Sequence, residues 1–258
     1  MAAFIEIRDV EKRYATRAGV QVALRPTSLE IAAGEFVSIV GPSGCGKTTL
    51  MKIVAGLLPC TRGEVRIDGV PVQEPPDGVG VVFQAPTLLR WRTVLDNVLV
   101  PADAQRRPRA RYAAAARDLI RLVGLEGFAN HYPRELSGGM QQRVAISRAL
   151  LLEPRLLLMD EPFGALDAMT REEMNLELQR IWNEQPKTVL FITHSIDEAV
   201  FLSDRVVVMT PRPGAVRAII DVELPRPRTL HVREHPRFIE HVGRIRDLIW
   251  SKPGGAIP

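Results

Sequence analysis

The chain has 258 residues, 46% of them hydrophobic and 25% charged, which is typical of a globular protein with a sizeable core. Its formal net charge of +4 comes from dispersed Lys and Arg, so the composition favours a solvated surface and predicts no nucleic-acid partner. The two cysteines, Cys45 and Cys60, predict no disulfide framework, and the absence of a signal-peptide core or a long apolar run predicts a cytoplasmic protein.

Apolar runs along the chain predict strands. Residues 4–7 alternate between apolar and polar side chains, as a half-buried strand does. Four later runs are almost wholly apolar, the pattern of strands covered on both faces in a parallel sheet: residues 36–40, 156–159, 189–192 and 206–209. The first three are each followed by a polar cluster. Because ligands of open α/β sheets bind outside the carboxyl ends of strands, this pattern predicts one site assembled from distant parts of the sequence.

The region between residues 86 and 153 has helical patterns instead. Residues 111–123 and 137–152 are the two clearest, with Ser137 placed as an N-cap and Pro154 ending the second helix. We therefore expect one domain over residues 1–258, with a helical subdomain at about 86–155 inserted in an α/β core. After a turn at 211–214 we expect an extended run at 218–224. A C-terminal extension at about 225–258, with a helix at 236–250, completes the prediction.

The eight residues that follow the apolar run 36–40 fit the phosphate-loop pattern G-x-x-x-x-G-K-[ST], in its required place after a buried strand. They are Gly41, Pro42, Ser43, Gly44, Cys45, Gly46, Lys47 and Thr48. The glycines let successive backbone N–H groups point at an anion, and a helix starting near Lys47 adds its positive end. We expect Lys47 to reach the β- and γ-phosphates of a nucleotide and Thr48 to ligate Mg²⁺. Cys45 is interpreted as a neutral loop residue.

A pair of carboxylates ends the apolar run 156–159. We expect Asp160 to lie at the sheet edge and to hold Mg²⁺. Adjacent strand residues point to opposite faces, so Glu161 cannot serve the same metal in the same way. Glu161 is therefore the candidate for polarising an attacking water. Four apolar residues before the pair and Pro162 after it argue against a solvated surface.

Three more residues are candidates on weaker signals. Gln84 follows the apolar segment 79–83 and could offer its side-chain oxygen to Mg²⁺ or to water. His194 follows the run 189–192 by two residues; as a neutral imidazole it could accept a hydrogen bond from the attacking water or hold a γ-phosphate, although a lone histidine is more often structural. For Tyr14, stacking on an adenine ring and a partly buried position near a turn are both open.

Together these motifs resemble the ATP-binding subunit of an ABC transporter, over essentially the whole chain. The matches are the Walker A loop at 41–48, Walker B at 156–160 with Glu161 as catalytic glutamate, the signature Leu136-Ser137-Gly138-Gly139, the Q-loop Gln84, the D-loop Ala165-Leu166-Asp167, the switch histidine His194 and the A-loop Tyr14. The resemblance favours stacking for Tyr14 and adds Thr49 to the cofactor-binding residues. It implies an α/β P-loop NTPase fold with a mainly parallel sheet, an N-terminal antiparallel β portion and an inserted α-helical subdomain.

The resemblance also implies a mechanism in which two subunits face each other head to tail around two ATP molecules. Ser137, Gly138 and Gly139 would then bind the γ-phosphate held by the other subunit, through backbone N–H groups and the helix dipole. The implied cofactors are ATP and Mg²⁺. The implied partners are a second copy, integral membrane permease subunits docked near Gln84 and, indirectly, an extracytoplasmic substrate-binding protein. The chain itself would lie at the cytoplasmic face of the membrane.

Two positions depart from the family pattern. Met140 stands where the signature usually has glutamine, which puts that contact in doubt, and Ser195 stands where an aspartate often follows the switch histidine.

The segment 84–98, and a tail made of 211–214 with 223–228, resemble subunits of nitrate, sulfonate and taurine importers, although relatives with similar features also serve the uptake of aromatic acids and pyrimidine precursors. An alternative is a soluble ABC ATPase of DNA repair or translation, which usually has a long coiled-coil insertion or two cassettes. A non-hydrolytic module would lack the catalytic residues present here. We expect the ATP-hydrolysing subunit of a bacterial importer.

Overall fold

The computed structural model of the protein describes residues 3–17, 19–184 and 186–250. These residues form two compact units. The first takes its described residues from 3–77 and 178–250, and the second is Gly78–Glu177. The prediction of a single domain with a subdomain at about 86–155 stays a prediction.

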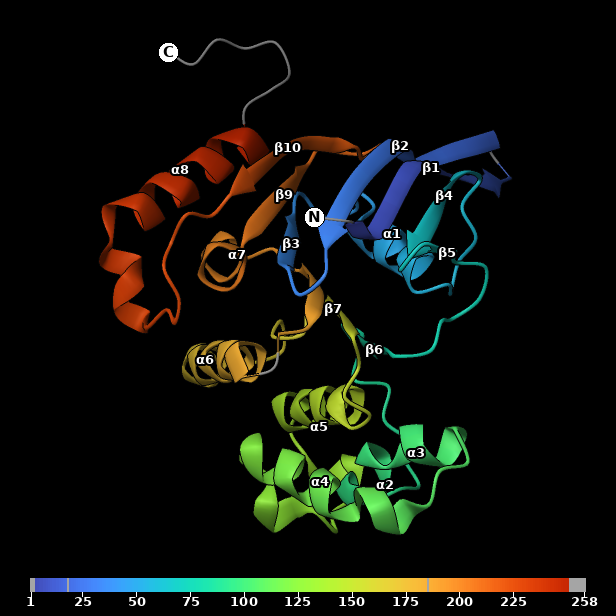
Figure 1. The fold of residues 1–258 in the computed structure, drawn as a ribbon, viewed down its shortest axis with the longest axis vertical. Helices are drawn as coiled ribbons and strands as arrows, with labels where there is room; N and C mark the ends of the chain where they lie inside the picture. Colours follow the sequence, from blue (N-terminus) through green and yellow to red (C-terminus); the bar gives the residue numbers. More distant parts are fainter. Residues whose placement is uncertain (1–2, 18, 185, 251–258) are drawn as a thin grey trace. The chain divides into compact units, whose positions relative to one another are not determined.

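An antiparallel sheet opens the first unit (Figure 1). It consists of β1 (Ala3–Thr16), β2 (Gly19–Ala32), β4 (Arg62–Ile67) and β5 (Val70–Pro71), in the order β2-β1-β4-β5. The alternation noticed at residues 4–7 belongs to β1, where Ile5 and Ile7 are fully buried. The predicted N-terminal antiparallel portion is confirmed, and β1 is longer than its pattern suggested.

A mainly parallel sheet forms the rest of the β-structure in this unit. Strand β3 (Phe36–Val40) pairs in parallel with β8 (Thr188–Ile192) and with β9 (Arg205–Met209), and β10 (Val216–Asp221) pairs with β9 in antiparallel. All five residues of β3 are buried, as a central strand requires. The extended run predicted at 218–224 ends earlier, at Asp221, because its ladder partner Arg205 is the first residue of β9.

Helices cover the strands of the first unit. Helix α7 (Ile196–Leu202) packs against β3 and β9, and α8 (Pro236–Trp250) packs against α7, β9 and β10 (Figure 1). Helix α1 (Lys47–Val54) contacts β2 and β8. A 3₁₀ helix, Leu230–Glu234, precedes α8, whose bounds match the predicted helix at 236–250.

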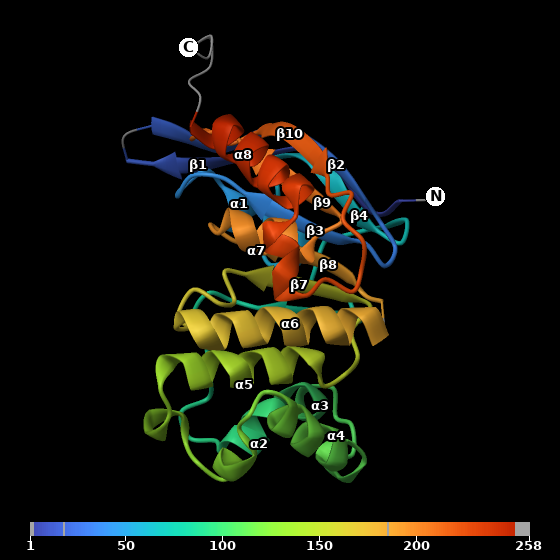
Figure 2. The ribbon, with the colours of Figure 1, turned by 90° about the vertical axis from the view of Figure 1, so that its left-hand side faces the viewer.

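The second unit is mostly helical. Helix α5 (Gly138–Leu150) packs against α2 (Val94–Val98), α3 (Val100–Ala104) and α4 (Arg109–Leu122), as Figure 2 shows. Two 3₁₀ helices, Glu126–Phe128 and Pro133–Glu135, connect α4 to α5. Strand β6 (Val79–Val82) pairs in parallel with β7 (Leu156–Asp160), and α6 (Ala168–Glu184) begins in this unit and ends in the other. Among the described residues, no helix has the length and apolar character needed to cross a membrane.

Within the first unit, a buried arginine joins the C-terminal segment to helix α7. Arg228 is 3% exposed, and its guanidinium donates to the carbonyls of Val200, Phe201, Ser203 and Leu224. The first three lie at the C-terminal end of α7, where the helix dipole favours a cation. Burial lowers the pKa of Arg228 to about 10, but the side chain remains charged at neutral pH. The cation is thus held by carbonyl dipoles.

We predict that Arg228→Met destabilises the protein by about 3 kcal/mol, because it leaves these carbonyls buried without a donor. The free energy of unfolding in urea measures the effect. Arg237→Met is the matched control: this side chain is 60% exposed, and its loss should cost less than about 0.5 kcal/mol. Equal stability of the two variants would contradict a structural role for Arg228.

Candidate functional site

The phosphate loop lies between β3 and α1. Gly44 and Gly46 have φ values of 74° and 101°, in the left-handed region that favours glycine. Gly46 is the N-cap of α1 and has no side chain to bond the first-turn N–H groups. Those groups are therefore not engaged by their own cap, as an anion site at a helix start requires. Thr48 and Thr49 lie half-buried in the first turn of α1.

The side chain of Lys47 folds back along its own loop. It is 6% exposed, and its Nζ donates to the carbonyl of Gly41 at 2.8 Å and to that of Pro42 at 3.1 Å. The same ammonium lies 3.9 Å from the Sγ of Cys45. Burial raises the pKa of the Cys45 thiol, while the charge of Lys47 opposes that rise. A buried neutral thiol fits the interpretation of Cys45 as a loop residue.

Asp160 and Glu161 differ in backbone conformation. Asp160 is the last residue of β7 and is 3% exposed. Glu161 lies beyond the strand with φ 46°, in the left-handed region. Strand alternation was the predicted reason why the two carboxylates separate, and that reason is wrong, because the chain leaves the strand between them. The left-handed turn directs Glu161 instead.

The side chains of Gln84 and Glu161 meet. Gln84 follows β6 and Glu161 follows the neighbouring β7, so both stand at the carboxyl ends of paired parallel strands. The Nε2 of Gln84 donates to Oε2 of Glu161 at 3.1 Å. The amide nitrogen thus contacts the carboxylate, which leaves the amide oxygen as the group that could serve a metal or a water.

The Ser-Gly-Gly element begins α5 as predicted. Ser137 is the N-cap, and its Oγ accepts a hydrogen bond from the N–H of Met140 at 3.2 Å. A Cβ added at Gly139 would lie 3.0 Å from Cδ2 of Leu166, so this glycine packs closely against the predicted D-loop. Two motifs 25 or more residues apart in the sequence are therefore neighbours in the second unit.

The D-loop residue Asp167 is fixed by the first turn of α6. Its carboxylate accepts the N–H of Thr170 at 3.0 Å, and this bond lowers the pKa of Asp167 below its usual value. Arg171 donates to the carbonyl of Leu166 at 2.9 Å, which holds the same loop from the helix side.

His194 is exposed between β8 and α7. Its neighbour Ser195 is the N-cap of α7 and accepts the N–H of Glu198 at 3.3 Å. The hydroxyl of Thr193 donates to the buried carboxylate of Glu198 at 2.6 Å and accepts the N–H of Ser195 at 3.0 Å. Ser195, which departs from the family pattern, thus has a capping role. Its spacing to Glu198 is that of a capping box, a signal that could have identified Glu198 from the sequence.

Tyr14 lies on β1 and is 37% exposed. The Nζ of Lys12 stands 5.2 Å from the centroid of its ring, a cation–π distance. Stacking of Tyr14 on an adenine stays a prediction.

Two side chains of α5 that the sequence did not single out hold the segment around Gln84. Gln142 is 1% exposed, and its Nε2 donates to the carbonyl of Phe83 at 3.0 Å. Arg148 donates to the carbonyls of Pro86 at 2.9 Å and Thr87 at 3.0 Å. Helix α5 therefore fixes the backbone on both sides of Gln84.

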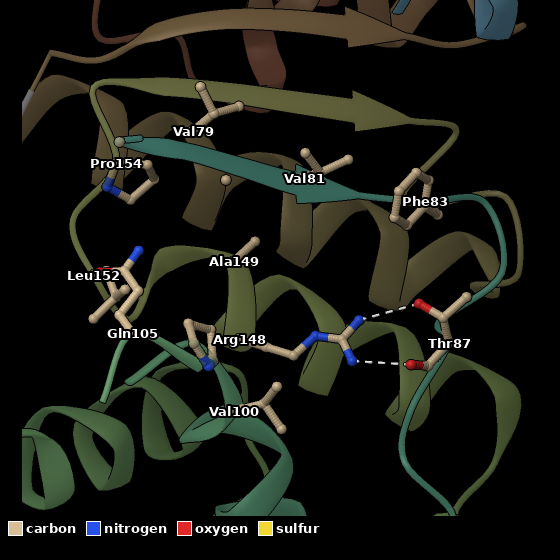
Figure 3. Close-up of a pocket in the computed structure, with 13 residues that line it drawn as sticks. Val79, Val81, Phe83, Thr87, Val100, Gln105, Arg148, Ala149, Leu152 and Pro154 are labelled. Atoms are coloured by element: carbon tan, nitrogen blue, oxygen red, sulfur yellow. Dashed lines mark hydrogen bonds between the residues drawn. The ribbon is translucent and has the colours of Figure 1, made fainter. Parts of the chain in front are cut away.

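A cavity of about 360 Å³ opens beside Arg148 in the second unit. Figure 3 shows the guanidinium reaching from α5 towards Thr87, with β6 along one side and Val100 of α3 nearby. Most other lining residues are apolar, among them Val79, Val81, Phe83 and Leu152. Burial lowers the pKa of Arg148, and among the described residues no carboxylate opposes this shift.

The predicted metal ligands are chemically suited to Mg²⁺. Thr48, Gln84 and Asp160 offer a hydroxyl, an amide and a carboxylate oxygen, the hard donors that this ion prefers. The described part of the chain contains no cluster of three or more His, Cys, Asp or Glu residues that could hold a metal.

Comparison with known proteins places the chain in one family. Residues 24–164 match the family model described as "ABC transporter". The chain is 46% identical to the taurine import ATP-binding protein of Rhizobium johnstonii, with 92% of this chain and 93% of that one covered. It is 42% identical to the bicarbonate transport ATP-binding protein of a Synechocystis strain, with 97% and 90% covered.

A solved structure supports the same family assignment. The dimeric post-hydrolysis state of an ATP-binding cassette bound to ADP and Pi has 35% sequence identity and a TM-score of 0.78, over 86% of this chain and 100% of that one. The predicted fold class is confirmed by this likeness.

Proposed function

Because the chain belongs to the ABC transporter family and is an ABC-type ATPase, we propose that it is the energy-coupling subunit of an importer for a small anion. The observation that carries the coupling is the contact between Gln84 and Glu161. The backbone carbonyls of Pro86 and Thr87, two and three residues after Gln84, accept hydrogen bonds from Arg148, which lines the cavity. A partner seated there would be linked to the Glu161 carboxylate through four residues of chain.

The residues have separate roles in ATP hydrolysis. Lys47 and the N–H groups of the phosphate loop bind the β- and γ-phosphates, and Lys47 leaves its two loop carbonyls to do so. Thr48, Asp160 and Gln84 would hold Mg²⁺, which would neutralise charge on the phosphates. Glu161 orients and polarises the attacking water, and His194 contacts that water or the γ-phosphate.

The remaining proposed nucleotide contacts are shared between two copies. Tyr14 stacks on the adenine, and Thr49 adds a hydroxyl in the first turn of α1. Ser137, Gly138 and Gly139 complete the site of a second copy, because an exposed helix start with small residues can approach a γ-phosphate closely. The dimeric state of the solved cassette supports this arrangement.

Membrane permease subunits are the proposed occupants of the cavity beside Arg148. Its apolar walls suit a short helical segment, and a desolvated cation without an opposing carboxylate suits an acidic residue of that segment. The subunit would then act at the cytoplasmic face of the membrane, with an extracytoplasmic binding protein delivering the cargo to the permease. No contact of this subunit with the cargo is required.

The small-anion cargo is supported by the names of the relatives, a taurine importer and a bicarbonate transporter. Aromatic acids and pyrimidine precursors are the second class of cargo. ATPase activity of the intact complex, measured with binding protein and each candidate cargo in turn, separates the two classes of cargo.

We predict that Glu161→Gln keeps ATP binding, lowers the turnover number by about 100-fold or more, and accumulates an ATP-bound dimer. The amide cannot polarise water, while the phosphate contacts remain. Phosphate release and size-exclusion chromatography with ATP measure the two effects. Glu126→Gln removes the same charge from an exposed turn and should change neither. Unchanged turnover in Glu161→Gln would refute the assigned role.

We predict that Val100→Asp weakens binding of the membrane subunits about tenfold or more, because its carboxylate would compete with the acidic residue of the partner for Arg148 and would add charge to an apolar wall of the cavity. Copurification with the permease measures this effect. Val70→Asp is the matched control, since Val70 is 66% exposed on β5. Equal recovery of the permease with both variants, each with an unchanged melting temperature, would place the docking surface elsewhere.

A further inference from the structure

The turn at residues 210–215 packs against the backbone of the phosphate loop. We propose that Gly214 is a positioning residue that fixes the conformation of this loop and thereby sets its affinity for ATP. The inference rests on the proposed role of the loop 41–48 in binding phosphate. It gives a nucleotide-site role to the segment 211–214, which the sequence pointed to only as a resemblance to certain importers.

The approach of Gly214 to the loop is a contact between two backbones. A Cβ added at Gly214 would stand 1.7 Å from the carbonyl oxygen of Cys45 and 3.1 Å from Cε of Met209. Gly214 does not have the left-handed backbone of Gly44 and Gly46, so lack of space, and not torsion, excludes a side chain here. Only glycine fits without moving the loop.

The turn cannot easily move away, because β2 holds it. The N–H of Arg25 donates to the carbonyl of Gly214 at 2.8 Å, and the N–H of Gly214 donates to that of Ala23 at 3.3 Å. Within the turn, the N–H of Thr210 donates to the carbonyl of Ala215 at 2.9 Å, and the hydroxyl of Thr210 accepts a hydrogen bond from the N–H of Ala215 at 3.0 Å. An atom added at Gly214 would therefore displace the loop or break this ladder.

Two further glycines show that the loop is packed at several points. A Cβ at Gly46 would lie 2.9 Å from the carbonyl oxygen of Ala23, and one at Gly41 would lie 3.1 Å from the Cβ and carbonyl oxygen of Met209. Together with the contact of Cys45, this means that three loop positions rest on β2, the end of β9 and the turn. Three separate segments thus fix one loop.

This packing matters because phosphate binding depends on the direction of the loop N–H groups. Relief of the Gly214 clash needs a shift of roughly 2 Å, since the added Cβ would stand 1.7 Å from the Cys45 oxygen and non-bonded heavy atoms prefer separations near 3.5 Å. A displacement of that size at a binding group can cost on the order of 100-fold in its effect. The segments that pack against the loop therefore contribute to ATP affinity through the conformation of the loop.

The test is Gly214→Ala in the full chain. We expect the Kd and KM for ATP to rise about tenfold or more, with a smaller change in kcat, because substrate binding is impaired and Glu161 is untouched. Gly243→Ala is the matched control, since a Cβ there meets nothing within 4 Å. An unchanged KM for ATP in Gly214→Ala would overturn the inference.

Two more variants keep the test decisive. Should Gly214→Ala not fold, Thr210→Val removes the hydroxyl that holds the turn without adding bulk against the loop; a KM raised about threefold supports the inference, and an unchanged KM overturns it. Lys47→Ala tests the proposed phosphate site separately from the role of Gly214. Full ATP binding by Lys47→Ala would refute the proposed phosphate site itself, whereas loss of binding there with normal binding in Gly214→Ala would refute only the role of Gly214.

Discussion

Backbone N–H groups can bind a phosphate strongly only when the chain that carries them is held in place, because a free loop would turn the same groups towards water. This constraint explains why the loop after β3 is so closely packed. Its glycines permit the tight backbone turn of the loop. The segments β2, the end of β9 and the turn at 210–215 pack closely against the loop backbone. The loop is also flanked by the buried strand β3 and by α1, so both of its ends are fixed.

In the second unit, the N-terminus of α5 is also capped and closely packed. At α5 a serine caps the helix, and glycine follows where Leu166 comes close. The helix then extends past Gln84, whose flanking carbonyls it binds through Gln142 and Arg148. One rigid element thus carries the proposed contact to a second copy and one wall of the proposed docking cavity. Movement of α5 would alter both, and this is the physical basis that we propose for coupling assembly to a membrane partner.

The sequence predicted the elements that burial and capping determine locally. The buried runs became β3, β7, β8 and β9, and Ser137 caps α5 as expected. The left-handed backbone of Glu161 was not predictable, since glutamate has no preference for that conformation. The contacts of Gly214 with Cys45, of Arg228 with Val200 and of Gln142 with Phe83 were also missed, because these pairs lie 169, 28 and 59 residues apart, and one sequence carries no signal of such proximity. The roles of the site residues stay predictions.

In the proposed mechanism Ser137–Gly139 of one copy completes the site of another, and ATP retention by mixed dimers measures this completion. One protomer carries Ser137→Arg and its partner carries Lys47→Ala, both in a Glu161→Gln background that stops hydrolysis. Completion between copies places both lesions in the same site, so the dimer should retain one ATP. With both lesions in one protomer, each site has one lesion and no ATP should be retained. The reverse result, no ATP in the first dimer and one in the second, would contradict the account.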